Sequence, residues 1–200
     1  MKKETQIREA LIENTIYLIA QGGFEMATTR NIAKCGANAA GLVLNDAYIY
    51  RIFGSKEGLY AEAFALLNEE IFSYMCRGLD NAKLDVKTAR EDLRVLWMWL
   101  WRFILNNETR SRAFVRYYYS IYLREASLRR HRECFNSVVV RVSCLFKEEA
   151  DVTAIMHNVL TSTFNFAIRV FNGDLDDDDV NVEHMYNVLY NTISSYLKEQ

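Results

Sequence analysis

Apolar residues recur at intervals of three and four along nearly the whole chain, which is the spacing of one face of an α-helix. The first stripe comprises Ile7, Leu11, Thr15 and Leu18, and similar stripes follow toward the C-terminus. No stretch alternates apolar and polar residues as a half-buried strand does. The pattern therefore predicts an all-α fold. Breaks between the stripes fall at residues 21–24, 81–85, 106–110, 124–127, 147–151 and 172–179.

Three short helices and the start of a long one are predicted in the first third of the chain. The glycines of Gln21–Phe24 end the first helix, because glycine accepts the left-handed conformation found at helix ends. Thr28 is a candidate N-cap of the second, because its hydroxyl can accept a free backbone N–H. Gly54 ends the third, and Ser55 is expected to cap the long helix.

Composition narrows the class of protein. The chain has 200 residues and no proline, which suits long uninterrupted helices. Its formal net charge is −2, so any contact with nucleic acid must come from a local patch. Cys35, Cys76, Cys134 and Cys144 form no CxxC pair and are interpreted as reduced thiols of a cytoplasmic protein. The most apolar segment, Val95–Leu105, is too short to span a membrane.

The first 64 residues contain a specific order of motifs: a Gly-aromatic turn, a threonine cap, an Ile-Ala pair, a helix bearing Tyr and Phe, and Ser-Lys-Glu-x-Leu. They stand at Gly23-Phe24, Thr28, Ile32-Ala33, Tyr50, Phe53 and Ser55–Leu59. Together they resemble the TetR family of bacterial transcriptional regulators. The resemblance implies an N-terminal three-helix helix-turn-helix head, residues 1–55. It also implies a larger helical effector-binding and dimerisation domain, residues 56–200.

In that family the second helix of the helix-turn-helix enters the major groove of operator DNA. Hydroxyls, helix N-termini and basic side chains hold phosphates, whereas contacts to base edges give sequence specificity. The resemblance implies that Tyr50 and Lys56 bind phosphates and that Asp46, Ala47 and Tyr48 face bases. The candidate DNA-binding residues are Thr28, Thr29, Arg30, Asn45, Asp46, Ala47, Tyr48, Tyr50, Arg51 and Lys56.

The sequence departs from the family pattern between the two helices of the motif. Gly36 and Tyr50 are fourteen residues apart where about seven is usual, so about seven residues are extra within Ala37–Asn45. They could lengthen the preceding helix, start the recognition helix early with Asn38 as its cap, or enlarge the turn. We favour an enlarged turn whose apolar side packs on the head and whose last residue, Asn45, caps the recognition helix.

Residues 86–122 are unusually aromatic. One helix carries two apolar stripes, through Trp97 and Trp101 and through Val95 and Trp99, which is typical of a buried helix. Aromatic walls with a few hydroxyls suit a pocket for an apolar or aromatic small-molecule effector. A filled aromatic core is the alternative. The candidate pocket residues are Trp97, Trp101, Phe114, Tyr117 and Tyr118, and the arginines that could meet an anionic group are Arg102, Arg112 and Arg116.

The last two predicted helices, about Val152–Asn172 and Val180–Lys198, also carry apolar stripes. The resemblance implies that they form the four-helix interface of a homodimer. Two-fold symmetry would suit a palindromic operator. The candidate interface residues are Ile155, Val159, Phe166, Met185, Leu189, Ile193 and Tyr196.

Clusters that could hold a metal are interpreted as structural. Asp174 and Asp176–Asp179 lack the spacing of an EF-hand and suit a solvated loop before a helix N-terminus. His131 and Cys134 share a helix face without an identifiable third ligand. The sequence contains no Walker loop, GxGxxG or Ser-His-Asp order. We therefore expect no metal, no cofactor and no enzymatic activity.

These observations favour a homodimeric DNA-binding repressor that is released from its operator by a ligand. The alternative is a family member that has lost operator binding through the insertion. Such a protein would act as a ligand-binding or protein-interaction module.

Overall fold

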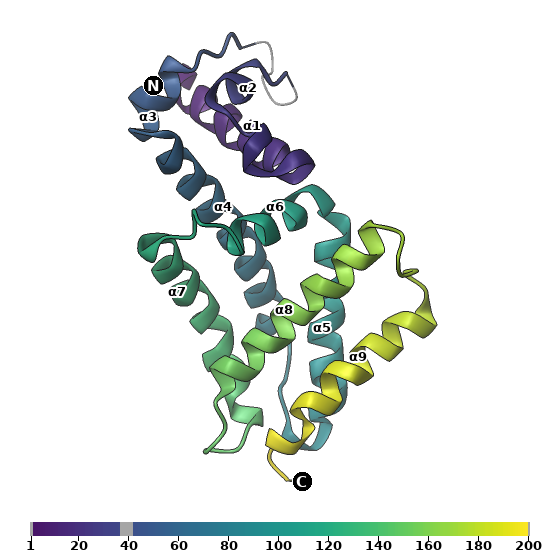
Figure 1. Cartoon of the computed structure of the whole chain (residues 1–200). Helices are drawn as coiled ribbons and strands as arrows, with labels where there is room; N and C mark the ends of the chain where they lie inside the picture. The colour runs from purple at the N-terminus through teal and green to yellow at the C-terminus, as the bar shows by residue number, and fades with distance from the viewer. Residues whose placement is uncertain (1, 37–41, 200) are drawn as a thin grey trace. The chain divides into compact units, whose positions relative to one another are not determined.

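The computed structural model describes residues 2–36 and 42–199, and this part of the chain is built from helices (Figure 1). The α-helices are α1 (Lys2–Met26), α2 (Thr29–Lys34), α3 (Ala47–Phe53), α4 (Lys56–Asp80), α5 (Ala89–Asn106), α6 (Glu108–Tyr118), α7 (Glu125–Val142), α8 (Val152–Phe171) and α9 (Asp179–Ile193). Short 3-10 helices are η1 (Val86–Thr88), η2 (Ser143–Leu145) and η3 (Ser194–Tyr196). In the described residues, β-type pairing is limited to an isolated bridge between Phe146 and Leu197. The predicted all-α fold is confirmed.

The chain forms two compact units. Unit 1 comprises Met1–Glu69 and Asn107–His131, and unit 2 comprises Glu70–Asn106 and Arg132–Gln200. Unit 1 therefore contains α1, α2, α3 and α6, and unit 2 contains α5, α8 and α9, while α4 and α7 contribute to both. The predicted boundary at residue 55 falls inside unit 1, between α3 and α4. It stays a prediction about which part of the chain contacts DNA.

The N-terminal helix α1 follows the predicted stripe, whose four residues are all buried. Gly22 and Gly23 depart from helical dihedral angles, and Gly23 has a φ of 74°. Because an L side chain rarely adopts such an angle, glycine is required at this kink. The predicted stop at the glycine pair is confirmed as this kink, which one further helical turn follows.

A buried asparagine on α1 fixes the end of α2. Asn14 is fully buried, and its Nδ2 donates to the backbone oxygens of Ile32 at 3.1 Å and Cys35 at 2.9 Å. At the other end of α2, the Thr28 hydroxyl accepts a hydrogen bond from the backbone N–H of Asn31 at 3.2 Å. The predicted N-cap is therefore confirmed, and α2 is held at both ends.

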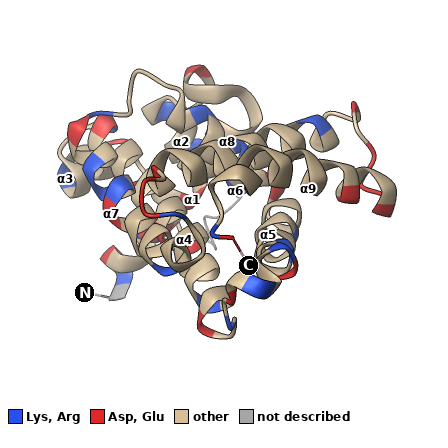
Figure 2. Cartoon of the chain, turned by 90° about the horizontal axis from the view of Figure 1, so that it is seen from below, with Lys and Arg blue, Asp and Glu red and all other residues tan. Residues whose placement is uncertain are grey.

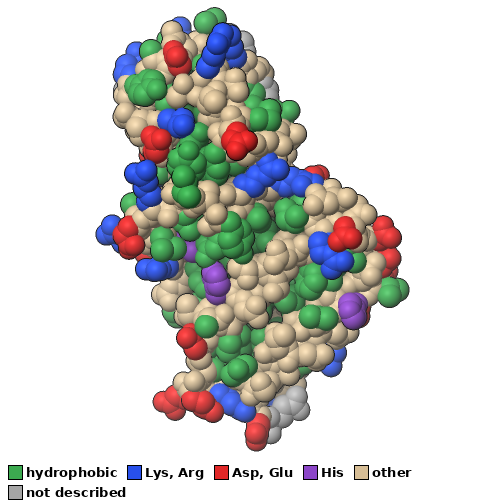
Figure 3. Space-filling view, viewed as in Figure 1, with side chains coloured by type: hydrophobic (Ala, Val, Ile, Leu, Met, Phe, Trp, Pro, Cys, Tyr) green, Lys and Arg blue, Asp and Glu red, His purple; other side chains and the backbone are tan. Residues whose placement is uncertain are grey.

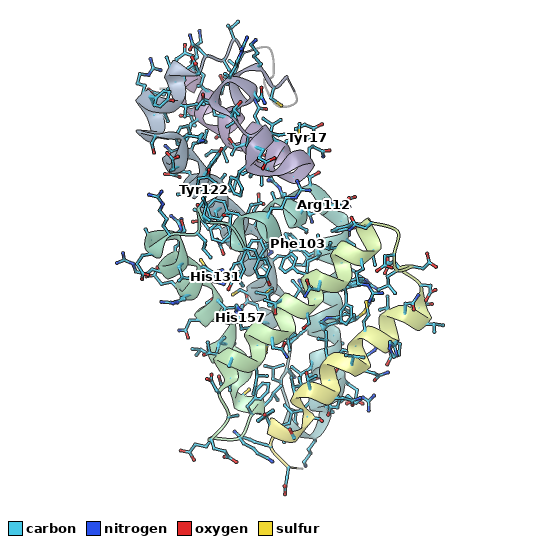
Figure 4. The ribbon with its side chains drawn as sticks, viewed as in Figure 1. Tyr17, Phe103, Arg112, Tyr122, His131 and His157 are labelled. Atoms are coloured by element: carbon cyan, nitrogen blue, oxygen red, sulfur yellow. The ribbon has the colours of Figure 1, made fainter. Side chains whose placement is uncertain are left out.

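Aromatic side chains join the start of α4 to the rest of unit 1. The hydroxyl of Tyr60 donates to the backbone oxygen of Ala27 at 2.5 Å. The Phe24 ring packs against Tyr60, with ring centroids 5.0 Å apart, and against Tyr122, which is labelled in Figure 4, at 4.5 Å. Burial raises the pKa of Tyr60, so this phenol remains a neutral hydrogen-bond donor.

Two buried indoles anchor α5 in unit 2. The Nε1 of Trp97 donates to the hydroxyl of Thr163 on α8 at 3.1 Å. The Nε1 of Trp101 donates to a carboxylate oxygen of Asp177, in the loop between α8 and α9, at 3.0 Å. Helices α8 and α9 lie side by side and both contact α5 (Figure 1). Both indole N–H groups are therefore hydrogen-bonded, as buried polar groups generally are.

The second apolar stripe of α5 is not buried, contrary to the prediction. Val95 is 62% exposed and Trp99 is 40% exposed. Trp99 stacks on Tyr74 of α4 at 5.1 Å and donates its Nε1 to the Tyr74 backbone oxygen at 3.2 Å. The physical reason is that α8 and α9 cover the face of α5 that bears Trp97, whereas the opposite face reaches solvent.

The cap of α2 yields a test of local stability. Replacing Thr28 with alanine should lower the free energy of unfolding by about 1 kcal/mol, because a free N–H of α2 loses its acceptor. Thr29→Ala is the matched control, since Thr29 follows the cap, and should change it by less than about 0.5 kcal/mol. Urea denaturation followed by circular dichroism, without DNA, measures both. Equal losses in the two variants would contradict the cap assignment.

Candidate functional sites

Helix α3 is short and is anchored by one fully buried side chain, Ile49. Tyr50 is 56% exposed, and Arg51 is exposed beside it. The Arg51 guanidinium lies 4.6 Å from the centroid of the Tyr48 ring, a cation–π distance. The ribbon near α3 includes both basic and acidic residues (Figure 2). The helix thus presents aromatic, hydroxyl and guanidinium groups to solvent.

The start of α3 is capped by Asn45. Its Oδ1 accepts a hydrogen bond from the backbone N–H of Ala47 at 2.8 Å, and its backbone oxygen accepts from Tyr48 N–H at 3.1 Å. Asp46, which directly precedes the helix, makes no capping bond with its side chain. The geometry agrees with the capping role predicted for Asn45.

The segment between α2 and α3 contains the predicted insertion. Residues 37–41, where most of the predicted insertion falls, lie outside the described residues. The residues that flank them, 35–36 and 42–46, are not helical. This contradicts a recognition helix running unbroken from Asn38, and α2 does not run on into residues 35–36. Val43 is 89% exposed, so the expected packing of this apolar side chain on the head is wrong.

The remaining DNA-binding candidates lie at the N-terminal ends of α2 and α4. Thr28 and Arg30 are exposed, and Thr29 is half-buried. Lys56 is the first residue of α4, and its Nζ lies 5.6 Å from the centroid of the Tyr60 ring. All of the predicted DNA-binding residues belong to unit 1.

The predicted pocket residues are divided between the two units. Trp97 and Trp101 belong to unit 2, whereas Phe114, Tyr117 and Tyr118 on α6 belong to unit 1. The rings of Phe114 and Tyr118 stack with centroids 5.9 Å apart. The prediction grouped these residues because they are close in sequence. The break between α5 and α6 instead allows α6 to pack against α1.

Arginine side chains keep α6 in place. Arg110 pairs with Glu13 of α1 at 2.8 Å, and Arg116 donates to the backbone oxygen of Ile19 at 2.8 Å. Arg112 pairs with Glu108 one turn earlier on α6, at 2.7 Å. Arg112 and Arg116, which were candidates for an anionic ligand, therefore have partners within unit 1.

Unit 2 contains an apolar cavity of about 60 Å³ between α4, α5, α7, α8 and α9. Trp97 is a predicted pocket residue that lines it. The sequence stripes gave no signal that the five helices leave a space. The lining residues are Met75, Leu79, Leu93, Leu96, Trp97, Leu100, Phe135, Val138, Val142, Met156, Val159, Leu160, Tyr186, Leu189, Tyr190 and Ile193.

The predicted dimer residues on α9 face the interior of their own chain. Met185, Leu189 and Ile193 are buried, with exposures of 2%, 4% and 5%. This corrects their assignment to an interface, because the apolar face of α9 packs on α5 and α8. Tyr196 is 47% exposed. The candidates that remain partly or largely accessible, for which the interface role stays a prediction, are Ile155, Val159, Phe166 and Tyr196.

Residues of the aspartate run make contacts at the end of α8 and at the start of α9. Asp178 caps α9 by accepting from the Asn181 backbone N–H at 2.8 Å, and Asp174 pairs with Arg169 at 2.7 Å. Within the described residues, no three His, Cys, Asp or Glu side chains are grouped so that they could hold a metal ion. No helix in this part of the chain is long and apolar enough to cross a membrane.

The buried His131 of unit 1 has a hydrogen-bonding role. Its Nδ1 lies 2.8 Å from the Oδ1 of Asn68 on α4 (Figure 4). Because the Nδ2 of Asn68 donates to the Phe64 backbone oxygen at 2.9 Å, its Oδ1 is the acceptor and His131 Nδ1 is the donor. This bond joins α7 to α4 within unit 1.

No protein-family model and no curated protein matches the sequence. Solved structures do match its fold. A TetR-family transcription regulator from Marinobacter aquaeolei VT8 superposes with a TM-score of 0.78 over 99% of both chains, at 19% identity. SmeT, the repressor of the Stenotrophomonas maltophilia multidrug efflux pump SmeDEF, superposes with a TM-score of 0.63 over 96% of this chain and 91% of its own, at 15% identity. The chain therefore has the all-α fold of the TetR-family transcription regulators.

Proposed function

We propose that the protein is a DNA-binding transcriptional repressor that acts as a homodimer and is released by a small molecule bound in unit 2. The exposed Tyr50 and Arg51 of α3, on a helix that Asn45 caps and Ile49 anchors, carry this proposal. The shared fold with TetR-family regulators supports it.

In this proposal, Tyr50 and Lys56 bind DNA phosphates, and Thr28 and Arg30 add contacts from α2. A phenol hydroxyl donates to a phosphate oxygen, and an ammonium group neutralises its charge. The anchoring of α3 by Ile49 favours DNA binding, because a rigid helix loses little conformational freedom when it docks.

Contacts that recognise the base sequence of the DNA would come from the first turn of α3. A carboxylate such as Asp46 accepts a hydrogen bond from the amino group of cytosine, and a methyl group such as that of Ala47 contacts the methyl group of thymine. Tyr48 is stacked with Arg51, which holds both groups at the surface of α3. These residues would define base preference, in contrast to the phosphate contacts.

Dimerisation would use the accessible faces of α8 and α9. Ile155, Val159 and Phe166 are partly exposed on α8, and Val188 is 41% exposed on α9. A two-fold pairing of these helices would present two copies of α3 to two half-sites of a palindromic operator. A ligand would release DNA only through a difference in its affinity for the DNA-bound and free conformations.

The exposed Val43, which precedes α3, favours a second candidate function. In that function, this apolar side chain would block the docking of α3 into the major groove. The protein would then bind ligands or other proteins without binding an operator. Strongly salt-dependent binding to duplex DNA distinguishes the two functions.

Removing the proposed phosphate contacts should weaken binding to all DNA sequences alike. Tyr50→Phe removes one hydrogen bond and should lower affinity about three- to tenfold, equivalent to about 1 kcal/mol. Lys56→Ala should also reduce the slope of log affinity against log salt by about 0.9. Fluorescence anisotropy with duplexes recovered from a random-sequence selection, at several salt concentrations, measures both.

Lys83→Ala is the control for these variants, because Lys83 is an exposed lysine of unit 2 that is not a proposed contact. It should leave the salt slope unchanged. A change in sequence preference at constant overall affinity in Tyr50→Phe or Lys56→Ala would contradict the phosphate assignment.

Charge placed on the accessible face of α9 should separate the subunits. Val188→Asp should give a folded monomer, because a carboxylate would be buried in the proposed interface without a partner. Sedimentation velocity reports the mass, and circular dichroism reports folding. Val140→Asp is the matched control, since Val140 is 64% exposed on α7, and it should remain a dimer. A Val188→Asp dimer of unchanged affinity would rule out this interface.

A further inference from the structure

The cavity of unit 2 has an unusually uniform chemistry. Its walls consist of aliphatic, methionine and aromatic side chains contributed by five helices. Among the residues that the structure describes, no charged side chain lines it. Apolar side chains also reach the surface of this unit (Figure 3). A molecule in the cavity would therefore be surrounded almost entirely by hydrocarbon.

Polar atoms of the lining are mostly committed to protein partners. The Nε1 of Trp97 donates to Thr163, and the hydroxyl of Tyr186 donates to the backbone oxygen of Arg90. Burial raises the pKa of Tyr186, so this phenol stays neutral. These bonds would have to break before either group could bind a ligand.

We propose that this cavity binds an uncharged, hydrocarbon-rich small molecule and excludes ligands that place a carboxylate, phosphate or ammonium group inside it. An ionised group would lose its hydration without gaining a counter-charge, which strongly disfavours binding. The inference deepens the proposed function, on which it rests for its regulatory meaning, by naming the chemical class of the effector.

The cavity has to expand when it binds a ligand. Its volume of about 60 Å³ is smaller than the ~150 Å³ of an engineered apolar cavity that holds benzene. Met75 and Met156 line the cavity, and methionine is unbranched with three rotatable bonds. Rotation of these side chains would add volume without moving a helix.

Three probes of nearly equal size separate charge from shape: toluene, benzoate and benzylammonium. We expect toluene to bind the full-length protein at least tenfold more tightly than either ion at neutral pH. Titration calorimetry measures affinity, and tryptophan fluorescence reports occupancy because Trp97 lines the cavity. Benzoate or benzylammonium binding as tightly as toluene, or the absence of saturable toluene binding, would overturn the proposal.

Matched variants locate the site. Met156→Ala enlarges the cavity and should strengthen toluene binding at least threefold. Met185→Ala removes another buried methionine, one that does not line the cavity, and should leave toluene affinity unchanged. Equal effects of the two substitutions would overturn the assignment.

A substitution that fills the cavity tests the same assignment if the Met156→Ala variant does not fold. Val138→Phe places a ring in the cavity and should weaken toluene binding at least tenfold. Val140→Phe makes the same change at an exposed position of the same helix and should leave it unaffected. Toluene binding that Val138→Phe leaves unchanged would place the ligand elsewhere.

These measurements are made without DNA, so the two proposals can fail separately. Selective toluene binding by a protein that binds no duplex would retain the cavity assignment and reject the regulator. Salt-dependent DNA binding by a protein that binds no toluene, or that binds benzoate as tightly as toluene, would retain the regulator and reject the cavity assignment.

Discussion

The end of α2, the helix that precedes the candidate recognition helix, depends on one buried amide. Asn14 is fully enclosed in unit 1, and a buried amide must be hydrogen-bonded. The last carbonyl groups of a helix lack partners within it, and Asn14 donates to those of Ile32 and Cys35 at the end of α2. Each group satisfies the other, so the place where α2 ends is set by α1.

The cavity of unit 2 is bounded by a different kind of contact from those of Asn14, and this difference suits the two proposed activities. Polar contacts such as those of Asn14 have strict geometry and hold the end of α2 in place. The cavity is bounded by apolar contacts, which have no preferred direction and can rearrange around a ligand. Its methionines can change rotamer without leaving a polar group unpaired. A fixed end of α2 and a cavity that can rearrange would suit the proposed ligand-responsive regulator.

Local signals allowed much of the fold to be predicted, because they depend on residues close in sequence. The caps at Thr28 and Asn45 and the kink at Gly23 are of this kind. Helical periodicity also identifies which residues are buried, but it does not identify what they are buried against. For this reason the aromatic residues of α5 and α6 were assigned to one pocket, and Leu189 was assigned to a partner subunit. The exposed Trp99 shows the same limit, since its stripe is as apolar as the buried one.

The cavity and the proposed dimer surface share two helices. Leu189 and Ile193 of α9 and Val159 of α8 line the cavity, while the accessible faces of the same helices would meet the partner. A ligand too large for methionine rotation alone to accommodate would change how α8 and α9 pack on α5, and that packing sets the shape of the outer surface. Linkage is reciprocal, so a dimer that favours one packing of these helices would favour or oppose the ligand by the same free energy. Ligand affinity would then depend on protein concentration, which couples the effector to assembly as well as to DNA.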